Sequence, residues 1–464
     1  MKNRIVITTM AAALLALSGC QIAPVKKTPK APVPESFPAP AAEAKAAADI
    51  GWRDFFQNAE LQQLIALALA NNRDLKTAAL RIEEARALYG IQRADQLPTV
   101  NATGGVTSSR QLFRGQPFQT TVYQVGLGLT AFELDFFGRV KNLSEAALAQ
   151  FFATEEAQRS AQIALVGEVA KAWLNERALA EQAQIAERTL KAREASYGLV
   201  KQRFDAGITN ALDLRQGETL VQSARSSLLA LKRQHAQSVN ALTLLTGSDA
   251  KLPAQTATLS AQSITADIGA GLPSDLLAHR PDIRAAEQQL RSSEANIAAA
   301  RAAFFPRISL TAGIGLASPA LSGLFESGSK VWNFAPALAV PIFDNGRNVS
   351  NLDLAKVRSN IAVANYEKTI QVAFREVADA LDARATLADE IASLEAVRNA
   401  QAARLELAQA RYKSGVSSYL DVLDAERELY NAEQQLLGTR LLKLTNAVDL
   451  YRSLGGGLNE VSAQ

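Results

Sequence analysis

The sequence contains very few of the side chains that enzymes use for nucleophilic or metal-dependent chemistry. Its 464 residues include one cysteine, Cys20, and two histidines, His235 and His279. A second cysteine that could form a disulfide or help to bind a metal is missing. The sequence also lacks a glycine-rich phosphate loop and a nucleophile motif. These absences argue against an enzyme, and they predict no catalytic residue, no metal site and no freely bound cofactor.

The sequence also has no marked excess of charge of one sign. It carries 49 Lys and Arg residues against 46 Asp and Glu residues, a formal net charge of +3. Two of the basic residues, Lys2 and Arg4, lie in an N-terminal segment that we expect to be removed, which leaves +1. This balance gives no reason to expect a nucleic-acid partner.

Long apolar runs are missing except at the N-terminus. An apolar stretch from Ile5 to Leu17 is followed by Ser18-Gly19-Cys20 and then Gln21. This pattern is typical of a bacterial lipoprotein signal, in which residues 1–19 are cleaved and Cys20 receives a covalent lipid. The absence of aspartate after Cys20 favours delivery to the outer membrane. An ordinary secretory signal with an unrelated cysteine is the alternative.

The mature chain is expected to begin with a tether and to contain no transmembrane helix. Six prolines lie between Pro24 and Pro40, which predicts an extended, lipid-anchored segment over residues 20–50. No later apolar run approaches the roughly 20 residues that a membrane-spanning helix needs.

The rest of the chain reads as one sequence written twice, with an offset of 208 residues. Asp74 matches Asp282, Gly138 matches Gly346, Gly207 matches Gly415 and Gly247 matches Gly455. One offset that holds through different kinds of segment predicts that both halves share one architecture. We therefore divide the chain into a first repeat (51–247), a connector (248–281), a second repeat (282–455) and a C-terminal tail (456–464).

Each repeat is predicted to contain a helix, two strands, a very long helix and a return helix. In the first repeat, an apolar stripe begins at Leu61 and continues to about Gln96. Two alternating segments follow, on either side of a turn predicted at Gly115-Gln116-Pro117. Apolar residues on one strand face oppose small and polar residues on the other, which favours lipid outside and water inside. The edge of a soluble sandwich is the alternative.

The second repeat shows the same alternation in two segments. One face of the first segment runs from Ile308 to Leu316, and one face of the second runs from Trp332 through Leu338 and Val340 to Ile342. Four strands are too few to close a transmembrane barrel, and open edges would leave backbone groups unsatisfied in lipid. The chain is therefore predicted to oligomerise.

The long helices follow the strands. The segment from Arg347 to Ser414 contains neither glycine nor proline. Its length predicts a rod of about 100 Å, with apolar spacing of the coiled-coil type. Gly207 and Gly415 end the two rods, and return helices run to Gly247 and Gly455.

Six short motifs stand out in the sequence: Trp52-Arg53-Asp54-Phe55-Phe56, Ala70-Asn71-Asn72-Arg73-Asp74-Leu75, His279-Arg280-Pro281-Asp282-Ile283-Arg284-Ala285-Ala286-Glu287, Phe305-Pro306, Phe343-Asp344-Asn345-Gly346-Arg347 and Arg411-Tyr412-Lys413-Ser414-Gly415-Val416. Together they resemble the motifs of the TolC/OprM-type outer-membrane efflux lipoproteins, which include NodT-like proteins. The resemblance implies a mainly α protein with membrane β-strands: a homotrimer with a 12-stranded β-barrel and a long periplasmic α-helical barrel. It also implies the exit duct of a tripartite efflux pump, working with a periplasmic adaptor and an inner-membrane RND-type transporter.

The resemblance also assigns roles to the two hairpin ends, where the family closes the pore and meets the adaptor. Turn chemistry alone would explain the glycines there. The residues expected at these tips are Arg203, Phe204, Gly207, Arg411, Gly415 and Val416.

The periplasmic gate is predicted on the helix after Gly415. Asp421 and Asp424 lie one helical turn apart and would recur around the axis of a trimer as rings of carboxylates. Ser418 to Asp421 also reads as a helix capping box, so Asp424 is the preferred gate residue. TolC has a gating arginine where this chain has Ser417. The full predicted gate is Asp424, Asp421, Leu420, Arg427, Asp213 and Tyr412.

Two other functions remain open from the sequence. A lipid-anchored periplasmic coiled-coil scaffold or adaptor would use the same long helices, although adaptors usually carry one hairpin and not two. A type I protein-secretion channel would share the duct. The sequence does not identify the exported substrate.

Overall fold

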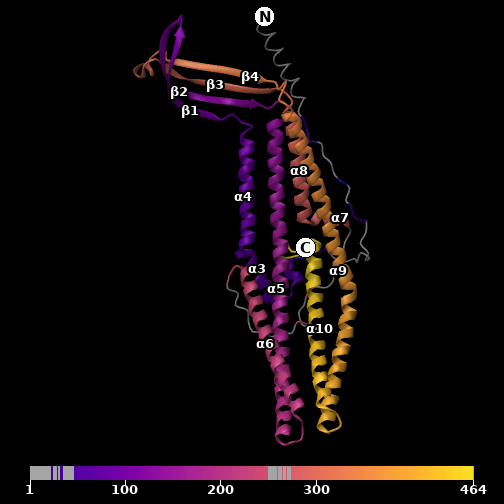
Figure 1. Cartoon of the computed structure of the whole chain (residues 1–464). Coiled ribbons are helices and arrows are strands. Elements are labelled where there is room, and N and C mark those ends of the chain that lie inside the picture. The colour runs from indigo at the N-terminus through magenta and orange to yellow at the C-terminus, as the bar shows by residue number, and fades with distance from the viewer. Residues whose placement is uncertain are drawn as a thin grey trace. The chain divides into compact units, whose positions relative to one another are not determined.

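The structure is a computed structural model that describes residues 22–24, 29, 32–34, 46–248, 259, 264, 268 and 273–462. Cys20 and much of the expected tether and connector lie outside the described residues. No helix in the described part is long and apolar enough to cross a membrane. The elements in chain order are η1 (Ala47–Asp49), α2 (Trp52–Phe55), α3 (Ala59–Asn71), α4 (Arg73–Ala94), β1 (Val100–Phe113), β2 (Gln116–Leu134), α5 (Arg139–Asp205), α6 (Ala211–Thr246), α7 (Pro273–His279), α8 (Pro281–Ala302), β3 (Arg307–Ser318), η3 (Leu321–Gly323), β4 (Lys330–Ala339), α9 (Arg347–Lys413) and α10 (Tyr419–Ser453) (Figure 1).

The chain forms two compact units, and each unit takes segments from both sequence repeats. The first comprises Met1–Lys30, Leu80–Glu155 and Ala285–Lys368. The second comprises Ala31–Ala79, Glu156–Arg284 and Thr369–Gln464. The long helices α5 and α9 contribute to both units. Compact units and sequence repeats are therefore different divisions of this chain.

The first unit contains one antiparallel sheet of four strands, in the order β1-β2-β3-β4 (Figure 1). Its register places Leu127 beside Ile314, and Ile314 beside Trp332. These three apolar side chains share a face and are 54%, 70% and 78% exposed. On the opposite face Gly126 pairs with Gly315. The two faces predicted from the sequence are therefore present, and the described residues leave the apolar one exposed.

Three details of the strands differ from the sequence-based expectation. The β1–β2 turn lies at Arg114 and Gly115, whose φ values of 51° and 81° suit a two-residue hairpin, so Gln116 and Pro117 already belong to β2. A bulge between Leu129 and Phe132 removes Ala131 from the apolar row. The strand β4 ends at Ala339, the partner of the first residue of β3, so Val340 and Ile342 lie beyond the ladder.

The helix expected from Leu61 to about Gln96 is two helices, α3 and α4, separated at Asn72. The Asn72 side chain accepts a hydrogen bond from the Leu75 amide at 2.9 Å, which caps α4. Its Nδ2 also donates to the carbonyl oxygen of Leu245 at 2.9 Å, at the end of α6. The break thus joins the start of α4 to the end of the return helix.

The predicted long hairpins are confirmed. The helices α5 and α9 contain 67 residues each, and the return helices α6 and α10 contain 36 and 35. Gly207 and Gly415 lie in the turns with φ values of 72° and 77°. Both turns belong to the second compact unit, as do the return helices.

The core of the second unit joins the start of the first repeat to the end of the second repeat. Phe55 stacks on Tyr451 with a centroid distance of 4.0 Å, and the Tyr451 hydroxyl donates to the carbonyl of Ile50 at 2.6 Å. The tail then runs along the N-terminal motif, where the Trp52 amide donates to the carbonyl of Asn459 at 2.9 Å. The last described residues of the chain are therefore packed against the start of the first repeat.

Candidate functional site at the hairpin turns

The two hairpin turns have the same backbone, position for position. The amide of Gly207 donates to Phe204 at 2.9 Å, and that of Gly415 donates to Tyr412 at 3.0 Å. The next residues, Ile208 and Val416, donate to the carbonyls of Arg203 and Arg411 at 2.8 and 2.9 Å. A positive φ at the glycine with these paired bonds is the usual way to end a helix. The turn itself is thus explained by backbone chemistry alone.

The helices after the turns are capped differently. The side chain of Asn210 accepts from the Asp213 amide at 2.9 Å, and the Thr209 hydroxyl donates to the Asp213 carboxylate at 2.6 Å. At the equivalent place, Ser418 makes no side-chain cap hydrogen bond. The capping box expected from Ser418 to Asp421 is therefore wrong, and Asp421 is an exposed carboxylate instead.

Asp424 is held by two arginines of its own chain. Its Oδ2 accepts from Arg404 on α9 at 2.5 Å, and its Oδ1 accepts from Arg427. Arg427 also contacts Glu428 at 3.1 Å. The four side chains together carry no net charge. The sequence identified Asp424 and Arg427 but missed Arg404.

The mismatches between the repeats could have revealed Arg404. Its counterpart in the first repeat is Ser196, and the counterparts of Asp424 and Arg427 are Gln216 and Thr219. The charges of Arg404, Asp424 and Arg427 therefore have no equivalent in the first hairpin.

Aromatic contacts join the two hairpins to each other. The guanidinium of Arg203 lies over the Tyr412 ring at 4.8 Å, and the rings of Tyr412 and Tyr419 are 5.3 Å apart. The Tyr419 hydroxyl donates to the Ser196 hydroxyl at 3.0 Å. Tyr419 is buried with Val200 in a small apolar cluster. Arg203 and Tyr412, predicted for different roles, thus form one contact between the hairpins.

Two buried ionisable residues lie near Tyr419. Glu426 and Arg193 are 6% and 7% exposed, and Glu426 Oε2 has no hydrogen-bond partner among the described residues. Burial raises the pKa of Glu426, although the charge of Arg193 opposes this. Burial lowers the pKa of Arg193, against the attraction of Glu426. Desolvation therefore outweighs the mutual attraction for both groups.

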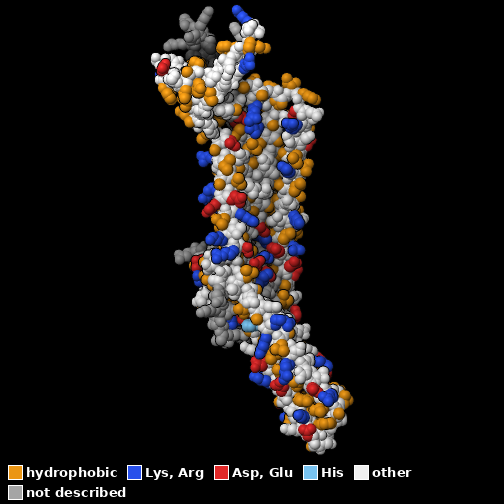
Figure 2. Space-filling view, turned by 60° about the vertical axis from the view of Figure 1, so that its left-hand side comes forward, with side chains coloured by type: hydrophobic (Ala, Val, Ile, Leu, Met, Phe, Trp, Pro, Cys, Tyr) orange, Lys and Arg blue, Asp and Glu red, His pale blue; other side chains and the backbone are white. Residues whose placement is uncertain are grey.

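The ends of the hairpins expose apolar side chains in matched pairs. Ile208 and Val416 are 71% and 67% exposed, and Leu212 and Leu420 are 65% and 57% exposed. Phe204 is also exposed. Figure 2 shows apolar side chains gathered at the end of the molecule where the chain turns. Isolated apolar side chains are common on protein surfaces, but a repeated group of them indicates a contact surface.

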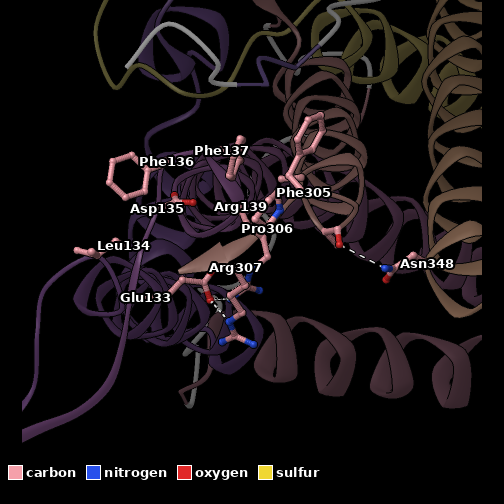
Figure 3. A pocket seen from close by; sticks show the side chains of 12 residues that line it. Glu133, Leu134, Asp135, Phe136, Phe137, Arg139, Phe305, Pro306, Arg307 and Asn348 are labelled. Carbon is pink, nitrogen blue, oxygen red and sulfur yellow. Dashed lines mark hydrogen bonds and ion pairs between the residues drawn. The ribbon is translucent and has the colours of Figure 1, made fainter. Parts of the chain in front are cut away.

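A second polar site lies in the first compact unit, where β2 and β3 meet the helices. Glu133 accepts from Arg139 at 2.9 and 2.7 Å and contacts Arg307 at 2.6 Å. Phe137 and Phe305 stack at 4.9 Å beside this cluster. These side chains line a cavity of about 280 Å³ (Figure 3). Within the described residues, no group of His, Cys, Asp or Glu side chains is arranged to hold a metal.

The fold defines a class of protein: long helical hairpins joined to a sheet with an uncovered apolar face are features of outer-membrane efflux channels. The family model for "outer membrane efflux protein" matches residues 64–248 and 272–456. Its two matches begin 208 residues apart, at the offset of the sequence repeat. This chain belongs to that family.

Relatives support the same assignment over nearly the whole length. The chain is 44% identical to the toluene efflux pump outer membrane protein TtgC of Pseudomonas putida, over 98% of this chain and 96% of that protein. It is 44% identical to the cation efflux system protein CusC of Escherichia coli, over 96% and 97%. The open state of the Neisseria gonorrhoeae MtrE outer membrane channel matches with a TM-score of 0.86 and 41% identity, over 96% and 100%. The protein is an outer-membrane efflux channel with the TolC-like duplicated fold.

Proposed function

We propose that three copies of this chain form the exit duct of a tripartite efflux pump. The carrying observation is the sheet: its outer strands β1 and β4 each pair on one side only, and one face is apolar and exposed. Backbone groups at open edges are costly in lipid, so sheets of several copies must join edge to edge. Three copies would supply the 12 strands that the resemblance implies, with the small and polar face toward water.

The hairpin turns are proposed as the periplasmic gate. Contacts between the hairpins, namely Tyr419 with Ser196 and Arg203 with Tyr412, must break if the second hairpin moves away from the first. The cluster around Asp424 lies within the second hairpin and keeps α10 beside α9. Asp421 is exposed and would supply the ring of negative charge. The two carboxylates thus have different proposed roles.

The exposed apolar ends of the hairpins are the proposed contact with a periplasmic adaptor. An inner-membrane RND-type transporter would supply the energy, because the duct performs no chemistry. A lipid on Cys20 would add an anchor in the outer membrane. The similarity to both a toluene and a cation efflux protein, at equal identity, supports small-molecule export without indicating the substrate.

Conductance in planar lipid bilayers tests the gate. We expect Asp421→Asn to lower cation selectivity with little change in open probability, because it removes charge but no contact. Asp424→Asn should raise the open probability. It removes the negative charge that Arg404 and Arg427 share, so α10 is held less firmly beside α9. Gln216→Asn, at the equivalent place in the first repeat, is the control. Unchanged conductance and selectivity in both aspartate variants would refute the gate.

The duct itself is tested by the assembly state. Protein extracted from outer membranes should run as a trimer that dissociates on heating. A lipid-free variant that is soluble in water as a monomer, without detergent, would instead support a periplasmic scaffold.

A further inference from the structure

The start of α5 binds a segment from near the N-terminus of the chain. Asn142 is 3% exposed, and its Nδ2 donates to the carbonyl of Gly138 at 2.6 Å and to the carbonyl of Ile22 at 2.9 Å. The Ile22 amide donates to the carbonyl of Phe137 at 3.4 Å. All of these residues belong to the first compact unit. Ile22 is therefore bound through both of its backbone polar groups.

The second repeat has the same backbone at the equivalent place without these contacts. Gly138 and Gly346 have φ values of 79° and 81°. Their carbonyls accept hydrogen bonds from the backbone amides of Asn142 and Ser350, both at 2.9 Å. A Cβ on Gly138 would meet the Asn142 amide nitrogen at 3.2 Å and Ile22 at 3.8 Å. A Cβ on Gly346 would meet no atom of the described residues within 4 Å. The binding of the N-terminal segment is thus specific to the first repeat.

The residue types explain this difference. An asparagine amide has two hydrogens to donate, and in Asn142 each of them is bound to a carbonyl. The serine at position 350 has a single hydroxyl hydrogen and could not bind two carbonyls at once. The bond to Gly138 uses only one of these hydrogens, and the carbonyl of Ile22 supplies the partner that the other hydrogen of this buried amide needs. The asparagine indicates a built site and not a chance contact.

We propose that Phe137, Gly138 and Asn142 form a docking site for the chain's own acylated N-terminal segment, where β2 ends and α5 begins. The proposal rests on the lipid at Cys20 and the membrane strands proposed above. Ile22 follows Cys20 by two residues, and two residues reach at most about 7 Å. Docking of Ile22 therefore fixes the height at which the lipid enters the membrane.

The side chains around the docking site are of the kind found at a membrane surface. Phe136, Phe137 and Phe305 line the same cavity (Figure 3). Aromatic side chains are favoured where a membrane meets water. The site would therefore hold the lipid at one distance from the sheet.

Electron paramagnetic resonance of a nitroxide at position 23 tests the docking. Ala23 is exposed, and an acylated Cys20 would not react with the label, so Ala23→Cys gives one labelled site. We expect an immobilised spectrum in the full trimer in detergent. Asn142→Ala should raise the mobile fraction several-fold, and the matched control Ser350→Ala should not.

A second variant keeps the test valid if Asn142→Ala fails to fold. Ile22→Pro removes the amide that donates to Phe137 and changes only the segment itself, so it should also mobilise the label. A mobile label in the parent protein, or no change in either variant, would overturn the docking site. Mass spectrometry of the N-terminal peptide reads the lipid separately: an unmodified Cys20 would overturn the anchor, whatever the spectrum shows.

Discussion

Equivalent positions in the two repeats make the same backbone contact with different side chains. Asn72 donates to the carbonyl of Leu245, and Arg280, 208 residues later, donates to the carbonyl of Ser453, both at 2.9 Å. The Arg280 guanidinium also donates hydrogen bonds to the carboxylates of Asp282 at 2.7 Å and Glu376 at 2.9 Å. Burial alone would lower the pKa of Arg280, but these two carboxylates raise it. Both carboxylates recur in the first repeat, as Asp74 and Glu168, but only the second repeat has the arginine that pairs with them.

The rest of this network shows the same asymmetry. Glu376 also lies 3.8 Å from Arg452, whereas their counterparts in the first repeat, Glu168 and Leu244, are exposed. The hairpin turns show the same difference between the repeats, since Asp424 and its two arginines have neutral counterparts in the first repeat. The repeat therefore preserves backbone geometry, and the side chains make the second copy different.

The largest expected effect comes from removing the contact in the second repeat. Arg280→Ala should lower the free energy of unfolding by about 3 kcal/mol, because Glu376 and the Ser453 carbonyl lose a buried partner. Asn72→Ala should cost about 1 kcal/mol, the usual loss of a cap. Unfolding of the trimer in denaturant, followed by circular dichroism, measures both. Equal losses would show that the ion pairs of Arg280 with Asp282 and Glu376 do not contribute to stability.

A smaller effect is expected where the hairpins meet. Tyr419→Phe keeps the ring in its apolar cluster but removes the hydrogen bond to Ser196, at a cost of about 1 kcal/mol. The bilayer open probability should rise, because the hairpins separate more easily. Tyr412→Phe, which keeps the ring under Arg203, is the control and should behave as the parent. A closed channel in both variants would contradict the role of this contact.

Replacing Arg404 by its first-repeat residue sharpens the comparison at the turns. Arg404→Ser should cost no more than about 0.5 kcal/mol in stability, because the ion pair with Asp424 is half exposed. Its effect on open probability should follow that of Asp424→Asn in the same bilayer assay. An effect of Arg404→Ser in a background that already carries Asp424→Asn would show that Arg404 acts elsewhere.

The smallest effect is expected from the buried carboxyl group near the turns. Because the folded pKa of Glu426 is raised above 4.5, the folded chain binds more protons than the unfolded chain between 4.5 and the raised value. Stability contributed by Glu426 therefore falls as the pH rises through that window. Glu426→Gln should remove this fall and leave the protein slightly more stable at neutral pH.

Its counterpart provides the control for that measurement. The side chain of Glu218 is 41% exposed and paired with Arg215 at 2.6 Å, so Glu218→Gln removes a surface carboxylate where Glu426→Gln removes a buried one. Thermal midpoints from pH 4 to 8 would measure both variants. A parent and a Glu426→Gln variant with parallel pH profiles would contradict the burial argument.

Sequence patterns predicted the architecture well, because periodicity and glycine position are local properties. The 208-residue offset, the two long hairpins and the four strands are all visible in the sequence. The sequence did not predict features that depend on contacts between residues far apart in the chain. Asn72 divides one predicted helix because its side chain binds Leu245, and the bulge at Ala131 depends on the register with β3. The partner Arg404 lies 20 residues before Asp424, across a hairpin.

The sequence by itself determined the repeat, the rods, the strand faces and the need for more than one copy, because each follows from residue period and length. Only the tertiary structure decided which charges meet. It paired Asp424 with Arg404, left Asp421 exposed, and placed Ile22 on Asn142. Such contacts depend on how elements far apart in the chain are brought together in space. A local pattern of residues does not specify which distant side chains become neighbours.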